Sequence, residues 1–132
     1  MVIDTSAVLA ILLGEPEAER FANAIERGHC HMSAASYLEA AIVIESRGDS
    51  LAYREFDLFF RRSRIVIEPV TLEQAQVARQ AFRDFGKGRH KAALNFGDCF
   101  SYALAKTRDE PLLFKGNDFG RAGVESALEI KS

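Results

Sequence analysis

Four acidic residues that lie far apart in the sequence form the pattern best suited to chemistry. They are Asp4, Glu39, Asp98 and Asp118, and each is expected just past a strand, in the next loop or the first turns of a helix. In a parallel α/β sheet such positions line one edge, where ligands bind. Carboxylates gathered there repel, by roughly 1 kcal/mol per pair at ~4 Å in water and about 4 kcal/mol at a partly buried site. A hard cation relieves that repulsion, and Mg²⁺ typically takes one or two carboxylates plus substrate phosphates. The set therefore indicates a metal-dependent phosphodiesterase, with a nuclease as the first expectation.

Each of these acids also has a purely structural interpretation. Asp4 suits the N-cap of a helix, Asp98 complements a helix dipole from the first turn, and Asp118 suits an Asx turn. Glu39 is more informative, because an unpaired Glu is almost never fully buried, and a structural salt bridge is its alternative. Its neighbours at i−4, i+3 and i+4 are all apolar: Ala35, Ile42 and Val43. We therefore expect Glu39 to project from an apolar helix face.

A polar stripe accompanies Asp98 along its helix. Asn95, Asp98 and Ser101 follow one another at i, i+3 spacing, and Tyr102 lies four residues after Asp98. The rest of that helix is apolar, so the stripe indicates a wet cleft beside a buried face.

Supporting polar groups flank the acids. The Ser6 hydroxyl, two residues after Asp4, suits a metal-bound water or a phosphate, although a helix cap explains it equally well. Asn117 either holds Asp118 in place or simply accepts a turn conformation. The basic segment with Lys87, Arg89 and Lys91 is a candidate phosphate-backbone contact, with a solvated loop as the alternative. The three histidines lack metal-ligand spacing, which argues against a zinc site.

Strands that alternate with helices are expected to position these groups. The expected strands are residues 1–4, 29–32, 65–67 and 111–114, with a short fifth at 128–130. The expected helices are residues 7–13, 17–27, 34–47, 51–62, 72–85 and 97–106. This alternation favours an α/β fold with a parallel sheet covered on both faces. The stripe of Phe56, Phe59 and Phe60 suits either the core or an interface, and such stripes are more often core.

Length and composition favour one soluble domain. The chain has 132 residues, 48% of them hydrophobic, which is enough for a core. Its apolar run at 7–13 is too short to span a bilayer and does not follow a basic stretch, so neither a membrane span nor a signal peptide is expected. Cys30 and Cys99 form no CxxC and are expected to be buried in a reducing cytoplasm. A net charge of −2 lacks the basic excess of a passive nucleic-acid binder.

Five stretches of the chain resemble the PIN-domain family, and within it the VapC toxins of prokaryotic VapBC toxin–antitoxin pairs. They are residues 2–7, 36–39, 86–90, 94–105 and 112–119. The most specific parts are Asn95-Phe96-Gly97-Asp98-Cys99 and Lys115-Gly116-Asn117-Asp118-Phe119. The resemblance implies one PIN-like nuclease domain over residues 1–132, an α/β/α sandwich with a central parallel sheet of four to five strands.

The same resemblance implies an activity and partners. It implies an endoribonuclease that depends on Mg²⁺ or Mn²⁺ and holds the metal with Asp4, Glu39, Asp98 and Asp118, with Ser6 and Asn117 in supporting positions. We take Asp4 and Asp98 as the direct ligands, and the other two acids as holding waters or a second ion. It also implies a homodimer that is neutralised by a cognate VapB-like antitoxin, whose C-terminal segment covers the cleft.

Three alternatives stay open. A haloacid-dehalogenase-like phosphatase needs a second acid two residues after the first, where this chain has Ser6. A flap-type DNA nuclease would use the same metal chemistry. A non-catalytic RNA-binding module with a decayed site is disfavoured because all four acids are present.

Overall fold

A parallel sheet forms the centre of the molecule and fixes where the candidate residues lie. The computed structural model describes residues 1–48 and 50–128. Within them the sheet has four strands in the order β3-β2-β1-β4. The strands are β1 (Val2–Ile3), β2 (His31–Ser33), β3 (Val66–Glu68) and β4 (Leu112–Leu113). All three pairings are parallel, so the carboxyl ends of the strands lie along one edge.

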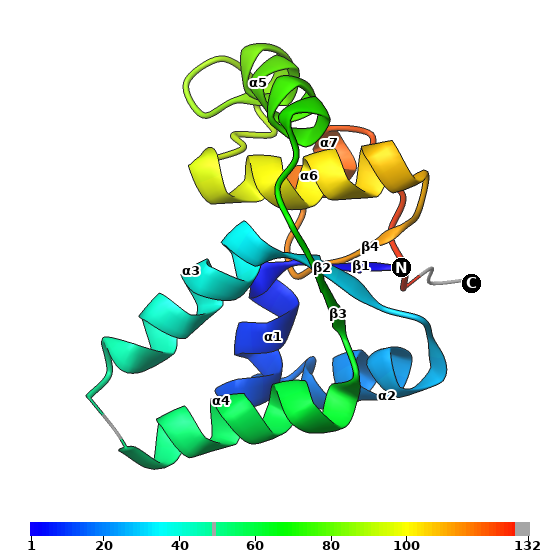
Figure 1. Ribbon diagram of the computed structural model, residues 1–132. Coiled ribbons are helices and arrows are strands. Elements are labelled where there is room, and N and C mark those ends of the chain that lie inside the picture. The colour runs from blue at the N-terminus through cyan, green and yellow to red at the C-terminus, as the bar shows by residue number, and fades with distance from the viewer. Residues whose placement is uncertain (49, 129–132) are drawn as a thin grey trace.

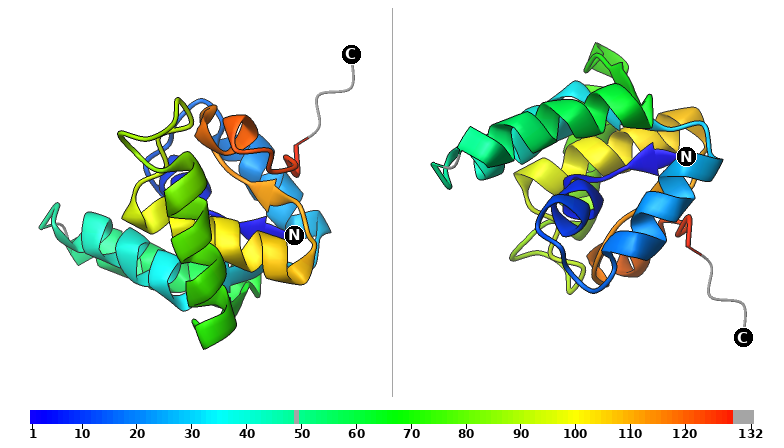
Figure 2. Two further views of the ribbon diagram at one scale, coloured as in Figure 1. Left: turned by 90° about the horizontal axis from the view of Figure 1, so that it is seen from above. Right: turned by 90° about the horizontal axis from the view of Figure 1, so that it is seen from below.

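Helices cover both faces of this sheet (Figure 1). They are α1 (Thr5–Leu12), α2 (Ala18–Arg27), α3 (Ala34–Glu45), α4 (Ser50–Ser63), α5 (Leu72–Phe85), α6 (Phe96–Arg108) and α7 (Asp118–Arg121). Figure 1 shows α5, α6 and α7 on one side of the sheet and α1, α2 and α4 on the other, and Figure 2 gives the same arrangement seen from above and from below. Helix α3 leaves the carboxyl edge of the sheet, and α4 runs back toward β3. This arrangement confirms the predicted α/β/α sandwich.

Two hydrophobic cores separate at the sheet because side chains alternate between faces along each strand. Ile3 and Leu113 join the core beneath α1, α3 and α4, whereas Val2 and Leu112 join the core beneath α6. All four are fully buried. Such strands, apolar on both faces, are typical of parallel sheets sandwiched between helices.

The phenylalanines of α4 belong to the first core. Phe56 is buried, and Phe59 and Phe60 pack against the same cluster. Phe60 also meets the Tyr37 ring of α3 edge-on, with centroids 4.9 Å apart. The core interpretation of this stripe is therefore confirmed.

Side-chain caps define where several helices begin. Ser33 accepts a hydrogen bond from the Ala35 amide, and Thr71 accepts one from the Gln74 amide. Helix α1 starts at Thr5, two residues before the predicted start, because Asp4 caps it.

Two further predictions concern the chain ends and membranes. Residues 129 and 130 of the predicted fifth strand lie outside the described residues, although Ser126 pairs with Leu112 in a single parallel bridge. None of the described helices is both long and apolar enough to cross a membrane.

Candidate functional site

Asp4 directly follows the carboxyl end of β1 and is the N-cap of α1. It is 3% exposed, and both of its carboxylate oxygens accept hydrogen bonds. Oδ2 accepts from the Ser6 amide at 2.9 Å, and Oδ1 accepts from the Ser101 hydroxyl at 2.5 Å. The capping role of Asp4 is therefore real. It leaves further lone pairs on both oxygens for another ligand.

Asp98 lies in the first turn of α6 and is held by a capping box. Its Oδ2 accepts from the Asn95 amide at 3.0 Å, and the Asn95 Oδ1 accepts from the Asp98 amide at 2.8 Å. Burial raises the pKa of the Asp98 carboxyl to about 6, the Asn95 hydrogen bond opposes that rise, and the charges of Asp4, Glu39 and Asp118 add to it. The structure thus brings Asp4, Glu39 and Asp118 within electrostatic reach of Asp98.

Glu39 reaches this group from α3 through a close contact with α6. A Cβ placed on Gly97 would overlap the Glu39 carboxylate, so a larger residue there would displace the carboxylate from this position. Glu39 projects from an apolar face of α3, but this face is less buried than its residue types suggest, since Ile42 is 55% exposed and Glu39 itself is half-buried. The reason is that α3 leaves the sheet edge, so this side of it meets solvent. No ion pair involves Glu39 in the part of the chain that is described, which disfavours the salt-bridge alternative.

Asp118 and its neighbours complete the edge after β4. Asp118 is exposed and begins α7, and Asn117 precedes it without a side-chain capping bond. Ser6 acts differently from the predicted helix cap, because its Oγ accepts the Lys115 amide at 2.9 Å. That bond ties the start of α1 to the loop that carries Asn117 and Asp118.

The basic segment lies on the loop between α5 and α6. Lys87, Arg89 and Lys91 are all exposed, and the Arg89 guanidinium lies 5.8 Å from the centroid of the Phe82 ring. The loop leads into the α6 N-terminus, where Asp98 lies. It therefore offers exposed cations on the segment that leads to the acidic edge.

Two buried serines belong to this site although only one was anticipated. Ser101 was part of the polar stripe, whereas Ser36 was missed, and each is 1% exposed. Their hydroxyl oxygens lie 3.1 Å apart. The available signal was position, because Ser36 precedes Glu39 by three residues and so lies on the same side of α3.

The donor set suits a hard cation with few protein ligands. Among residues 1–48 and 50–128, no three His, Cys, Asp or Glu side chains form a ready-made metal cage. Mg²⁺ does not need one, since it usually keeps several waters and uses one or two carboxylates plus substrate phosphates. The raised pKa of Asp98 is the observation that fits an ion here, because a cation would relieve the repulsion that contributes to it.

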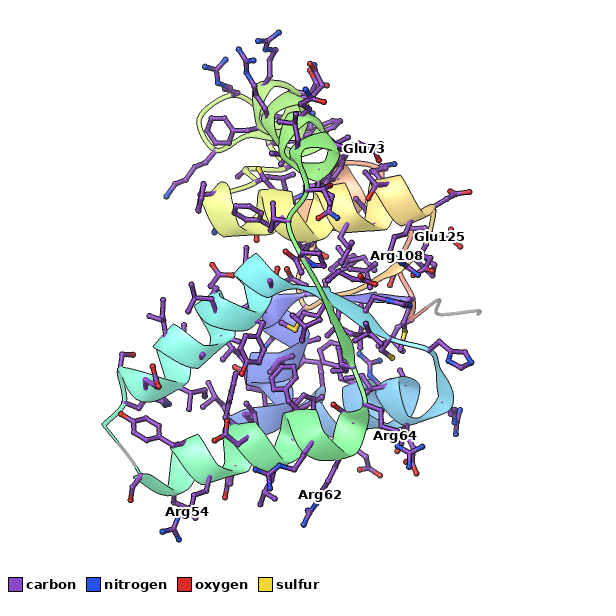
Figure 3. All side chains as sticks on the ribbon, in the orientation of Figure 1. Arg54, Arg62, Arg64, Glu73, Arg108 and Glu125 are labelled. Carbon is purple, nitrogen blue, oxygen red and sulfur yellow. The ribbon has the colours of Figure 1, made fainter. Side chains whose placement is uncertain are left out.

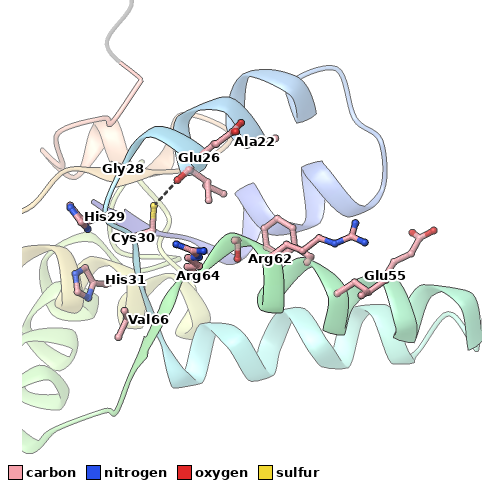
Figure 4. Close-up of a pocket in the computed structure, with 14 residues that line it drawn as sticks. Ala22, Glu26, Gly28, His29, Cys30, His31, Glu55, Arg62, Arg64 and Val66 are labelled. Atoms are coloured by element: carbon pink, nitrogen blue, oxygen red, sulfur yellow. Dashed lines mark hydrogen bonds between the residues drawn. The ribbon is translucent and has the colours of Figure 1, made fainter.

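A surface hollow lies away from the acids, near the amino-terminal ends of β2 and β3. It measures 890 Å³ and lies between α2, α4 and the start of β2 (Figure 4). Cys30 lines it, and its thiol donates to the Ile25 carbonyl at 3.5 Å. Both cysteines are free and buried, and their burial confirms the prediction. Burial raises the pKa of the Cys30 and Cys99 thiols, which favours their protonated form. Arg62 also lines the hollow, and Figure 3 shows Arg54 and Arg62 projecting outward from α4.

Comparisons with known proteins find similar sequences over nearly the whole chain. The family model for the PIN domain matches residues 1–125. Ribonuclease VapC30 of Mycobacterium tuberculosis is 56% identical over 125 residues, which cover 94% of this chain and 95% of that protein. Ribonuclease VapC28 of the same species is 51% identical over 131 residues and covers 98% of each chain.

Solved structures match the fold at low sequence identity. VapC20 of Mycobacterium tuberculosis, described as a toxin that cleaves the sarcin–ricin loop, matches with a TM-score of 0.71 and 20% identity over 93% of this chain and 95% of that one. A toxin–antitoxin complex from Klebsiella pneumoniae matches with a TM-score of 0.71 and 18% identity over 98% of each chain.

Proposed function

This chain belongs to the PIN-domain family, and on that basis we propose that it is the toxin of a type II toxin–antitoxin pair. As one domain, it hydrolyses RNA phosphodiester bonds as an endoribonuclease. The observation that carries the proposal is its 56% identity, over nearly the whole chain, to a VapC ribonuclease. The four acids at one sheet edge support the same conclusion, because like charges gather where a cation and a phosphate can bind.

In this proposal Mg²⁺ or Mn²⁺ binds to Asp4 and Asp98, and Glu39 and Asp118 hold waters or a second ion. When bound, such an ion lowers the pKa of a bound water, which gives a nucleophile for in-line attack on phosphorus. Asp4 is suited to this role because two hydrogen bonds fix its orientation. Asp98 is suited because the Asn95 capping box fixes its carboxylate at the α6 N-terminus.

RNA binding in this proposal uses the basic loop beside the acids. The exposed side chains of Lys87, Arg89 and Lys91 contact phosphates away from the scissile bond. Such contacts orient the backbone without reading its sequence.

The proposed partners are a cognate VapB-like antitoxin and a second copy of this chain. Toxin–antitoxin complexes among the structural neighbours support the antitoxin. The phenylalanines of α4 lie in or against the core, which favours another surface for the dimer. Between α5 and α6 lies an apolar hollow of 380 Å³, lined in part by Phe82, Phe96 and Phe100, and we assign the dimer contact to it. A cytoplasmic location belongs to the same proposal, since the two free cysteines suit a reducing compartment.

A substrate comparison tests the proposal against its alternatives. The purified protein is incubated with bacterial RNA, single-stranded DNA of matched length and p-nitrophenyl phosphate, each with Mg²⁺, Mn²⁺ or EDTA. We expect cleavage of RNA alone, with either metal and not with EDTA. Cleavage of DNA at the same rate would favour the flap-type nuclease, and turnover of the small ester with RNA intact would favour the phosphatase. Binding of RNA without cleavage under every metal would favour the non-catalytic module.

A further inference from the structure

A chain of buried hydroxyl groups runs beneath the acidic edge. The Ser101 Oγ lies 2.5 Å from the Asp4 Oδ1, and it lies 3.1 Å from the Ser36 Oγ. A serine hydroxyl has one proton, and Ser101 donates its proton to the carboxylate, which can only accept. The Ser36 hydroxyl therefore donates to Ser101. The direction of the chain is fixed from Ser36 through Ser101 to Asp4.

These hydrogen-bonded hydroxyl groups join the elements that carry three of the four acids. Ser36 lies three residues before Glu39 on α3, and Ser101 lies three residues after Asp98 on α6. Asp4 ends β1, and the hydroxyl of its neighbour Thr5 donates to the Ser36 carbonyl at 3.1 Å. Each hydroxyl thus lies about one helical turn from an acid. The hydroxyl groups therefore hold Asp4, Glu39 and Asp98 at a fixed spacing.

The hydrogen bonds of Asp4 also fix how its carboxylate is turned. The Ser6 amide holds one oxygen and the Ser101 hydroxyl holds the other, so the carboxylate cannot rotate without breaking a bond. Both oxygens keep a further lone pair for an ion. Asp4 and Ser101 are almost fully buried. Removal of the Ser101 hydroxyl would therefore leave the Asp4 Oδ1 without its hydrogen-bond donor.

We propose that Ser101, supported by Ser36, is a positioning residue that preorganises Asp4 for divalent-metal binding. This inference rests on the proposed function, in which Asp4 is a metal ligand. Groups that hydrogen-bond to a ligating side chain commonly govern metal affinity as well as geometry. Ser101 therefore acts through Asp4 and contacts neither the ion nor the RNA.

The test measures Mn²⁺ affinity of the full chain without RNA, by titration calorimetry. Wild type is compared with Ser101→Ala and Ser36→Ala, and thermal unfolding by circular dichroism is recorded for each. Thr107→Val is the matched control, since the Thr107 hydroxyl bonds only to backbone carbonyls of its own helix. We expect Ser101→Ala to weaken Mn²⁺ binding by about 10- to 100-fold. Ser36→Ala should weaken it less, and Thr107→Val should leave it unchanged.

Cleavage assays on the same variants supply a second readout. The Mn²⁺ concentration that gives half-maximal cleavage should rise in Ser101→Ala in parallel with the calorimetric affinity. A purely structural role of the hydroxyls would lower the unfolding temperature and leave both metal measurements unchanged.

The outcomes separate this inference from the proposed function. Wild-type Mn²⁺ affinity in both serine variants, while Asp98→Asn loses binding, would overturn the inference and leave the metal site intact. If wild type itself binds no Mn²⁺, the proposed function fails together with the inference. If Ser101→Ala does not fold, Ser36→Ala decides, and unchanged affinity in that variant overturns the inference.

Discussion

At the scale of single residues, Asp98 has both a structural hydrogen bond and an unfavourable charge. Its carboxylate accepts the amide of Asn95, the N-cap of α6, yet burial and three nearby acids oppose its ionisation. The capping box explains why an acid is tolerated at this position. The raised pKa of Asp98 reports repulsion from the neighbouring acids, which a bound cation would relieve. The same residue can therefore support the fold of the metal-free protein and bind the metal.

The raised pKa of Asp98 predicts how the stability of the metal-free protein depends on pH. Its folded-state pKa of about 6 lies above the ordinary value of 3.8. The native state therefore holds this proton over a range where the unfolded state has lost it, so stability falls as pH rises through that range. In EDTA, we expect Asp98→Asn to unfold at a higher temperature than wild type at pH 7.5, with a smaller difference at pH 4. A difference that stays constant from pH 4 to 7.5 would contradict this reading of Asp98.

At the scale of elements, the site depends on how closely α3 approaches α6. Gly97 lets the Glu39 carboxylate occupy the space that a side chain would fill. Helix caps and helix periods follow local patterns, which is why the cap at Asp4 and the bounds of α5 could be predicted from sequence. The cap at Asn95 was missed, because the helix was expected to begin at residue 97. The exposure of Ile42 beside Glu39 could not be predicted, because it depends on α3 leaving the sheet edge. The pairing of Ser36 with Ser101 joins residues 65 positions apart, and no local pattern reports such a contact.

Gly97→Ala tests this helix contact. The added methyl group must displace the Glu39 carboxylate, and because that carboxylate is the far end of a flexible side chain, the shift should cost little stability. Gly120→Ala is the matched control, since a Cβ there meets nothing within 4 Å. Urea unfolding should therefore give similar stabilities for the two variants, whereas Mn²⁺ binding, followed by calorimetry, should weaken in Gly97→Ala alone. Wild-type Mn²⁺ affinity in Gly97→Ala would show that the position of the Glu39 carboxylate against α6 does not matter to the metal site.

At the scale of the whole molecule, a parallel sheet collects side chains from distant segments at one edge. Asp4, Asp98 and Asp118 follow or flank three different elements, and the sheet order places β1 between β2 and β4. His31 of β2, Glu68 of β3 and Arg108 of α6 form a hydrogen-bonded ion-pair group. By contrast, no ion pair involves Asp4, Asp98 or Asp118 among the described residues.

The proposed dimer predicts a change of mass for one surface variant. Phe96 is 79% exposed and lines the apolar hollow between α5 and α6, so it offers contact area at little cost to the monomer. Light scattering should give twice the 14.7 kDa chain mass for wild type and a lower mass for Phe96→Ser. A wild-type monomer would contradict the dimer, and a dimeric Phe96→Ser would move its interface elsewhere.

The most direct test of the whole account is metal-dependent RNA cleavage by two matched variants. Asp98→Asn and Asp109→Asn make the same chemical change at opposite ends of α6, and Asp109 has the left-handed φ of 52° that asparagine also adopts readily. With Mn²⁺, we expect Asp109→Asn to cleave like wild type and Asp98→Asn to lose cleavage while remaining folded, and EDTA should silence all three. Cleavage by Asp98→Asn at the wild-type rate would contradict the acidic edge as the site of catalysis.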